Sequence, residues 1–324
     1  MDLSSNKTAF TLTPGDSEGI LRWRHEMEQA FPPLQIIPQD AATFSASYSA
    51  AGTADLQISD IRASAHTVER RPGPVTEHNI GYYKISYQVA GTGVMSQGNR
   101  ELLLTPGTIA LYDTALPYDL HFDDDYHFIV AMFPKMALDL PEGLATELTA
   151  YPVDGESGPA SMVAQFLLSL ADNLEILPSA SGNRIARTGL DLLTSLVGSE
   201  VDSSLISDRR DRKTFLVELC HYINQHLQDP SLSAESIAAA HFISTRHLHN
   251  IFQAGGVTLA QWIKQRRLQE CRGDMSDPLN AARSVAEIAA RWAFDDPGYF
   301  SRIFKQSFGV PPSQWRQSVL PAAA

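Results

Sequence analysis

The segment IFQAGGVTLAQW at residues 251–262 is repeated in outline as IFKQSFGVPPSQW at residues 303–315. In each copy an Ile-Phe pair is followed by Gly-Val and then by Gln-Trp. The copies lie about fifty residues apart, a period typical of a repeated unit of a few helices. A run rich in small residues precedes each copy, IAAA at 237–240 and IAAR at 288–291. Each copy is therefore predicted to be a helix-turn-helix.

Capping signals place the second helix of each unit. Ser244 can cap a helix that runs to about Gln253, where two glycines follow. In the second unit Asp295 or Asp296 can cap the helix. Pro297 then falls in the first turn, where its missing N–H costs nothing. Both helices are therefore expected to begin at well-defined positions.

A helix-turn-helix can place its second helix in the major groove of DNA. One long helix predicted at 259–275 joins the two units, so they should read groove segments about one turn, roughly 10 bp, apart. The predicted DNA contacts are Ser244, Arg246, His249, Asn250, Tyr299, Ser301, Arg302 and Lys305. Arg can read guanine and Asn can read adenine, whereas Ser301 and Lys305 suit phosphate or the groove margin. Each side chain could instead belong to an ordinary solvated helix face.

The net charge of -12 does not exclude DNA binding, because the acidic residues are unevenly distributed. Residues 205–324 carry 14 Lys and Arg against 11 Asp and Glu, whereas residues 1–204 carry 11 against 26. Since electrostatic fields are screened over roughly 8 to 10 Å, a distant acidic domain need not prevent contact with phosphates. The charge therefore permits DNA binding without demonstrating it.

Other features of the composition indicate an intracellular protein. No run approaches the roughly 20 apolar residues that cross a bilayer, and the N-terminus lacks the basic and apolar blocks of a signal peptide. We therefore expect a cytoplasmic protein without membrane contact. The only two cysteines, Cys220 and Cys271, are expected to be reduced packing residues, with a redox sensor as the alternative.

Residues 44–133 show short alternating runs separated by turn residues, a pattern typical of a small β-sandwich or β-barrel. A helix at 19–31 comes before them, with Trp23, Met27 and Phe31 on one side. After Pro134 the apolar period becomes helical, and two stripes predict an antiparallel helix pair. Its apolar faces could pack on the β domain or form a dimer interface. The expected domains are 1–155 for ligand sensing, 156–204 for the helix pair with dimerisation, and 205–324 for DNA binding.

Residues 212–318 resemble the DNA-binding domain of AraC/XylS family transcription regulators. The resemblance is carried by EIAARWAF at 287–294, YFSRIFK at 299–305 and FGVPPSQWR at 308–316. The first unit fits the same pattern through Ser244, Arg246, Leu248, Phe252 and residues 266–268. Residues 64–70, 83–87, 91–93 and 104–118 resemble the sensor domain of one branch of that family. In total the likeness covers about residues 20 to 320.

The resemblance implies an α+β protein with a small, cupin-like N-terminal β-barrel sensor and flanking helices. An all-α C-terminal domain with two helix-turn-helix units would follow. It also implies an effector-responsive activator of a catabolic or stress operon. The expected partners are double-stranded promoter DNA, a small-molecule effector, RNA polymerase and a second copy of the chain, with no cofactor.

The chain departs from the family pattern at the turns, where Phe242 and Ala293 stand in place of a common Gly. A positive φ costs a non-Gly residue on the order of 1 kcal/mol, so these turns are either strained or built differently. Asn250 replaces a frequent basic residue, and residues 297–298 replace longer polar side chains. Base reading by the second unit would therefore depend on few residues.

The β domain is the expected place for a small effector, since a small barrel can enclose one ligand. The polar and aromatic residues Arg70, Tyr82, Lys84, Tyr87, Tyr112 and Tyr118 are the predicted ligand contacts. Aromatic rings together with a cation would suit an aromatic or carboxylated compound. The same alternation of Tyr and Lys is also typical of a half-exposed strand.

Two other classes of function remain open. A cupin-like metal enzyme would need its ligands from His66, His78, His121 and His127 or from residues 123–125, but the spacing does not favour a metal site. These histidines are instead expected at the surface, and no metal or catalytic residue is predicted. An adaptor that keeps the helical domain without binding DNA is the other alternative. Exposed arginines on paired recognition helices argue against it.

Overall fold

The computed structural model describes residues 5–14, 19–31, 34–71, 81–138, 149–179, 181–203 and 209–319. The chain forms two compact units, one of residues 1–135 and 146–197, the other of residues 136–145 and 198–324. The helix pair predicted at 156–204 therefore belongs, up to residue 197, to the same unit as the strands. Within the described ranges no helix combines the length and apolar character needed to cross a membrane.

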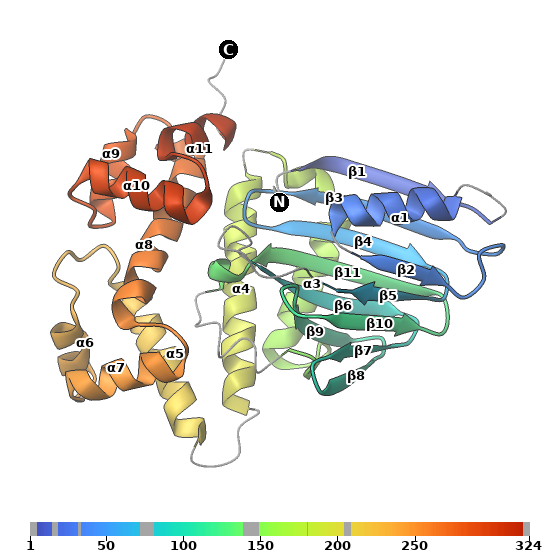
Figure 1. Cartoon of the computed structure of the whole chain (residues 1–324), viewed down its shortest axis with the longest axis horizontal. Helices are drawn as coiled ribbons and strands as arrows, with labels where there is room; N and C mark the ends of the chain where they lie inside the picture. The colour runs from blue at the N-terminus through green and yellow to red at the C-terminus, as the bar shows by residue number, and fades with distance from the viewer. Residues whose placement is uncertain are drawn as a thin grey trace. The chain divides into compact units, whose positions relative to one another are not determined.

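The first unit contains two antiparallel sheets (Figure 1). The larger has the order β1 (Ser5–Leu12), β3 (Ala46–Gly52), β4 (Gln57–Ala63), β11 (Tyr126–Pro134), β6 (Tyr82–Ala90), β9 (Thr108–Asp113) and β12 (Pro152–Asp154). The smaller has the order β2 (Gln35–Pro38), β5 (His66–Arg70), β10 (Tyr118–Phe122), β7 (Gly93–Gln97) and β8 (Arg100–Leu104). No ladder between described strands joins one sheet to the other, so the unit is a two-sheet sandwich, one of the two forms expected from the strand pattern, and does not close into a barrel. Alternation predicts strands, but closure depends on edge pairings that are distant in the sequence.

Strand β11 explains how the large sheet is buried on both faces. Phe128 and Val130 belong to the core between the two sheets, together with Met132. Ile129 and Phe133 point to the opposite face, because successive side chains alternate across a strand. Helix α3 (Gly158–Asp172) contacts β11 and β4 and covers that face. The continuous apolar run at 128–133 therefore follows from burial on both sides.

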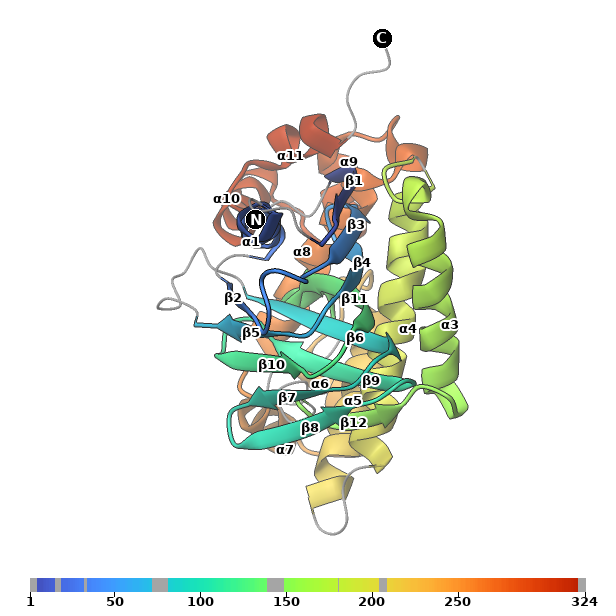
Figure 2. The ribbon, with the colours of Figure 1, turned by 90° about the vertical axis from the view of Figure 1, so that its right-hand side faces the viewer.

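Helices α3 and α4 (Gly182–Ser203) lie along the large sheet, with η2 (Leu174–Ile176) between them (Figure 2). Gly189 of α4 permits their close packing, because a Cβ there would lie 2.5 Å from Cε1 of Phe166. The helix pair thus packs on its own sheet, one of the two arrangements expected. Helix α1 (Gly19–Ala30) packs against β1 and β2 and buries Trp23 and Met27. η1 (Lys135–Ala137) follows β11.

The second unit is helical, as predicted. Its elements are α5 (Arg209–Gln225), α6 (Ala234–Ala240), α7 (Thr245–Ala254), α8 (Leu259–Ser276), η3 (Pro278–Asn280), α9 (Val285–Arg291), α10 (Pro297–Phe308) and α11 (Pro312–Val319). The side chain of Ser244 caps α7, and that of Asp296 caps α10. Gly309, with φ of 80°, ends α10 in the left-handed conformation that glycine adopts without strain. Both helix-turn-helix units and their boundaries are therefore confirmed.

Helix α8 is held firmly to the second helix-turn-helix unit. The Asp274 carboxylate accepts a hydrogen bond from Trp292 Nε1 at 2.8 Å, and Ser276 Oγ accepts one from Trp315 Nε1 at 3.2 Å. The Arg272 guanidinium lies over the rings of Phe308 and Trp315, at 4.9 and 5.4 Å from their centroids. Burial lowers the pKa of Arg272 to about 10. These contacts pack α8 against the second helix-turn-helix unit.

The opposite end of α8 is tied to α5 and the loop after it. Arg266 Nε donates to Asn224 Oδ1 at 3.1 Å, and Arg267 donates to the carbonyls of Leu227 and Asp229. The two arginines of the family pattern therefore have structural roles. Cys271 and Cys220 are both buried, and burial raises the pKa of the Cys271 thiol, which supports a packing role.

Candidate DNA interface and internal cavity

The first recognition helix, α7, presents a polar face formed by Arg246, His249 and Asn250, all exposed. On the other face Leu248, Ile251 and Phe252 are buried. Neither Arg246 nor Asn250 has an ion-pair or hydrogen-bond partner among the described residues. Ser244 lies at the start of this face, where its Oγ accepts a hydrogen bond from the His247 backbone N–H at 3.2 Å. His247 is also exposed and was not among the predicted contacts.

The second recognition helix, α10, has the same design. The predicted contacts Tyr299, Ser301, Arg302 and Lys305 are all exposed, whereas Phe300, Ile303 and Phe304 are buried. The Asp296 carboxylate accepts from the backbone N–H groups of Gly298 and Tyr299, at 2.8 and 3.0 Å. An Asp cap satisfies these N–H groups and compensates the positive end of the helix.

The turns of both units carry non-glycine residues with positive φ, 56° at Phe242 and 59° at Ala293. The strained form of the turn, one of the two alternatives, is therefore confirmed. Phe242 is also 97% exposed, so its side chain gains little from burial.

We expect Phe242→Gly and Ala293→Gly each to stabilise the helical unit by about 0.5 to 1 kcal/mol. Relief of left-handed strain is worth about 1 to 2 kcal/mol, and the greater flexibility of unfolded glycine removes part of that gain. Urea unfolding of the full chain, followed by tryptophan fluorescence, measures the change. Ala254→Gly, inside helix α7, is the control and should destabilise the unit, because its backbone is helical. Equal destabilisation by all three changes would show that the turns are not strained.

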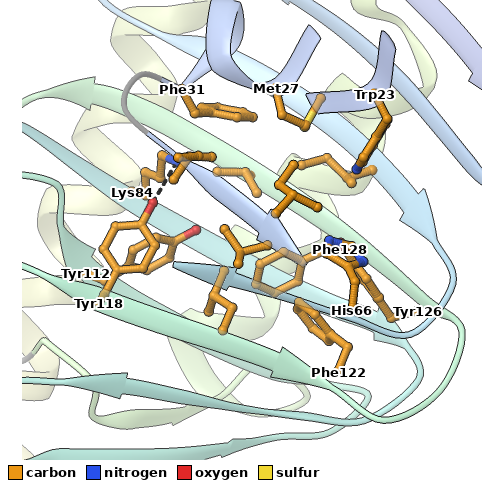
Figure 3. A pocket seen from close by; sticks show the side chains of 16 residues that line it. Trp23, Met27, Phe31, His66, Lys84, Tyr112, Tyr118, Phe122, Tyr126 and Phe128 are labelled. Carbon is orange, nitrogen blue, oxygen red and sulfur yellow. Dashed lines mark hydrogen bonds between the residues drawn. The ribbon is translucent and has the colours of Figure 1, made fainter. Parts of the chain in front are cut away.

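The sandwich encloses a cavity of about 40 Å³ between its sheets, beneath α1 (Figure 3). It is lined by Trp23, Met27, Phe31, Leu34, Ile36, Ile61, His66, Val68, Lys84, Tyr112, Tyr118, Leu120, Phe122, Tyr126, Phe128 and Val130. The lining is apolar and rich in aromatic rings, with few polar groups. That is the composition of a small-molecule site.

One end of the cavity is formed around Lys84 (Figure 3). Its Nζ donates a hydrogen bond to the Tyr118 hydroxyl at 3.1 Å and lies 3.9 Å from the centroid of the Phe31 ring. Tyr112 packs edge-on against Tyr118, with ring centroids 5.0 Å apart. Burial and then the charge of Arg70 lower the pKa of Lys84 well below its usual value. Burial raises the pKa of both tyrosines, so their hydroxyls remain protonated.

The other end contains His66, Tyr126 and Trp23. His66 Nδ1 must donate to the Ser64 carbonyl at 2.8 Å, because a carbonyl only accepts. Nε2 is then an acceptor, and the Tyr126 hydroxyl donates to it across 3.4 Å. Burial lowers the pKa of His66 to about 4, so the ring is neutral at physiological pH. The buried indole N–H of Trp23 has no hydrogen-bond partner in the described part of the chain.

Three of the six predicted ligand contacts, Lys84, Tyr112 and Tyr118, line the cavity. Arg70 does not line it, because its Nε is turned to the Thr114 carbonyl at 2.7 Å. Tyr82 packs at the edge of the core outside the lining, and Tyr87 falls on the opposite face of β6 from Lys84 by strand alternation.

The residues that α1 contributes to the cavity were missed by sequence reasoning. The spacing of Trp23, Met27 and Phe31 did indicate one apolar helix face, which was the available signal. His66 was missed as well, and the expectation of a surface position is wrong for it, because it is 1% exposed.

The histidines considered for a metal site lie apart. His121 hydrogen-bonds to Thr67 and Asp123 at the surface, and His127 pairs with Asp60 at 2.7 Å. His66 lies in the core, and His78 falls outside the described residues. Among the residues whose placement is described, no three His, Cys, Asp or Glu side chains are grouped as metal ligands would be.

The chain combines two recognition helices with a sandwich that contains an apolar cavity. This combination defines a DNA-binding transcription regulator with a sensor domain. Comparison with known proteins supports this class. Residues 23–197 match the AraC-binding-like domain, and residues 237–318 match a helix-turn-helix domain family. The chain belongs to the AraC/XylS family of transcription regulators.

Relatives align over most of the chain. Transcriptional activator NphR of Rhodococcus sp is 27% identical over 303 residues, which cover 93% of this chain and 89% of that protein. XylDLEGF operon transcriptional activator 1 of Pseudomonas putida is 23% identical over 71% of this chain and 73% of its own. The crystal structure of the AraC-like transcriptional activator CuxR has a TM-score of 0.50 at 20% identity, covering 88% of this chain and 99% of that one. This structural likeness shows the shared fold.

Proposed function

We propose that the protein is an effector-responsive activator of a catabolic or stress operon. In this proposal the cavity of the sandwich binds a small aromatic or carboxylated effector, and α7 and α10 read adjacent major-groove segments of promoter DNA. The protein acts in the cytoplasm as a homodimer and contacts RNA polymerase. The sensor domain binds its effector without transforming it. Two of the relatives are named transcriptional activators, which supports activation over repression.

The observation that carries the DNA-binding part is the pair of polar helix faces at a spacing fixed by α8. Arg246 and Arg302 are exposed and make no ion pair within the described part of the chain. An arginine without an internal partner keeps its donors available for guanine or phosphate. The buried contacts of Asp274 and Arg272 hold the second unit on α8, so the second helix meets the groove at a set distance from the first.

The test is binding of the purified chain to its own upstream intergenic DNA over a series of salt concentrations. We expect specific binding that weakens steeply as salt rises, because each phosphate contact releases counter-ions. A random duplex of the same length is the control, and it should bind more weakly by about 10³-fold or more. Equal affinity for both duplexes, with and without added effector candidates, would contradict the proposal and favour an adaptor or an enzyme.

A further inference from the structure

We infer that the effector is a small monocarboxylic acid with a flat apolar body, and that its carboxylate pairs with Lys84 inside the sandwich. This inference rests on the proposed function of the cavity as the effector site. It adds the chemical class of the effector and its orientation.

The first argument is that Lys84 has no counter-ion among the described residues. The side chain is buried, with the residue 4% exposed, and its described polar partner is the uncharged hydroxyl of Tyr118. No Asp or Glu is among the residues that line the cavity. A buried ammonium without an anion is costly, because burial removes its hydration and one phenol and an aromatic ring replace only part of it. A ligand carboxylate would supply that anion.

A second lysine of the sandwich, Lys135, shows the contrast. Lys135 Nζ lies 2.6 Å from Oδ2 of Asp113, and both side chains are largely buried. The fold therefore provides a carboxylate for Lys135 and leaves Lys84 facing the cavity with aromatic rings and a phenol. Arg70 adds to the positive field at Lys84 and is itself turned away from the cavity. An anion that enters the cavity is thus attracted by both Lys84 and Arg70 but contacts only Lys84.

The second argument sets the number of charges. Lys84 is the one charged side chain of the lining, since His66 is neutral when its pKa is about 4. A dicarboxylate would bury a second anion among apolar walls without a partner, and an amine would bring a second buried cation next to Lys84. Both are disfavoured for the same reason. The lining therefore selects a single negative charge.

The third argument concerns the body of the ligand. Figure 3 shows Phe31 and Met27 on one side of the cavity, with Phe122, Tyr126 and Phe128 across from them. Rings on opposite walls suit a flat apolar group. Figure 3 also shows Trp23 and His66 at the end away from Lys84. The N–H of Trp23, which has no partner among the described residues, would donate to an oxygen at the far end of the ligand, next to His66, whose Nε2 accepts from the Tyr126 hydroxyl.

The experiment measures binding of defined acids to the full chain by calorimetry. The probes are benzoate, phenylacetate and 3-phenylpropanoate, their 4-hydroxy derivatives, and the amide of each. We expect at least one acid to bind, and its amide to bind about 30-fold or more weakly, the usual cost of removing one partner of a buried charge pair.

Lys84→Met provides the second arm. This variant should lose affinity for the acid by about 30-fold or more and should bind the amide better than the acid. A reversal of preference cannot arise from misfolding. The matched control is Lys264→Met, which removes a half-buried lysine of α8 in the other unit and should leave acid binding unchanged.

Three outcomes would overturn the inference: amides that bind as tightly as acids, unchanged acid affinity in Lys84→Met, or no acid bound at about 10 mM, a concentration that detects even weak ligands. Failure of the proposed function has a different signature. In that case an acid binds with the expected dependence on Lys84 but changes neither DNA affinity nor transcription from the promoter.

Discussion

A chain that carries both Arg246→Ala and Arg302→Ala is expected to bind its operator about 10² to 10⁴-fold more weakly and to lose most of its preference over random DNA. Each bidentate arginine contact is worth about 1 to 3 kcal/mol of discrimination, and the two sites lie in separate helix-turn-helix units, so their effects should add. Both side chains are exposed, so the fold should not change. Competition binding at constant salt measures the loss.

The lysine variants separate base reading from phosphate contact. Arg246→Lys and Arg302→Lys keep the charge but lose the planar fork that matches guanine. We expect these changes to restore much of the non-specific affinity and the salt dependence without restoring sequence preference. Arg62→Ala, which removes an exposed arginine of the sandwich, is the control for net charge and should have no effect. Operator affinity of the double alanine variant within about threefold of the wild type would place DNA recognition elsewhere.

The helical unit could be predicted from the sequence because its signals are local. The cap at Ser244, the proline in the first turn of α10 and the glycine after it each act within one turn of helix. The positive φ at Phe242 and Ala293 could also be predicted, because these residues stand where the family pattern commonly has Gly. What the sequence could not show is the task of each arginine. Arg266 and Arg267 make hydrogen bonds within the chain, whereas Arg246 is exposed. This difference follows from the tertiary packing and cannot be read from the sequence.

The cavity was harder to predict because it depends on pairings that are distant in sequence. Strand β4 pairs with β11 through Ala63 and Tyr126, and the two sheets are closed over by a helix that begins at residue 19. Alternation along β6 separates Lys84 from Tyr87 but does not tell which face is the inner one. Trp23 reaches the cavity from α1 and His66 from β5, and no local pattern gives the positions of these elements. The sequence therefore predicted that aromatic and cationic side chains form the site, but it identified only some of the individual residues.

Lys84 and Lys135 should respond to the same substitution with changes in stability of opposite sign. Lys84→Met is expected to stabilise the ligand-free sandwich by about 1 to 4 kcal/mol, because an apolar side chain of similar size replaces a buried charge that has no carboxylate partner. Lys135→Met is expected to destabilise it by about 3 to 5 kcal/mol, because Asp113 is left buried without its cation. Urea unfolding at about pH 7 measures both values.

The advantage of Lys84→Met should depend on pH in a defined direction. The pKa of Lys84 is lower in the folded chain than in the unfolded chain, so the unfolded state binds more protons between the two values. The free energy of unfolding of the wild type therefore rises with pH across that interval. The difference in unfolding free energy between Lys84→Met and the wild type becomes smaller. Arg70, whose pKa is lowered by burial, is the other cation beside Lys84, and Tyr112 and Tyr118, whose pKa values are raised by burial, stay neutral over this interval. Unfolding of both proteins from pH 7 to about 10 tests the trend. A gap that widens with pH would mean that Lys84 has an internal anionic partner and that the cavity needs no carboxylate from outside.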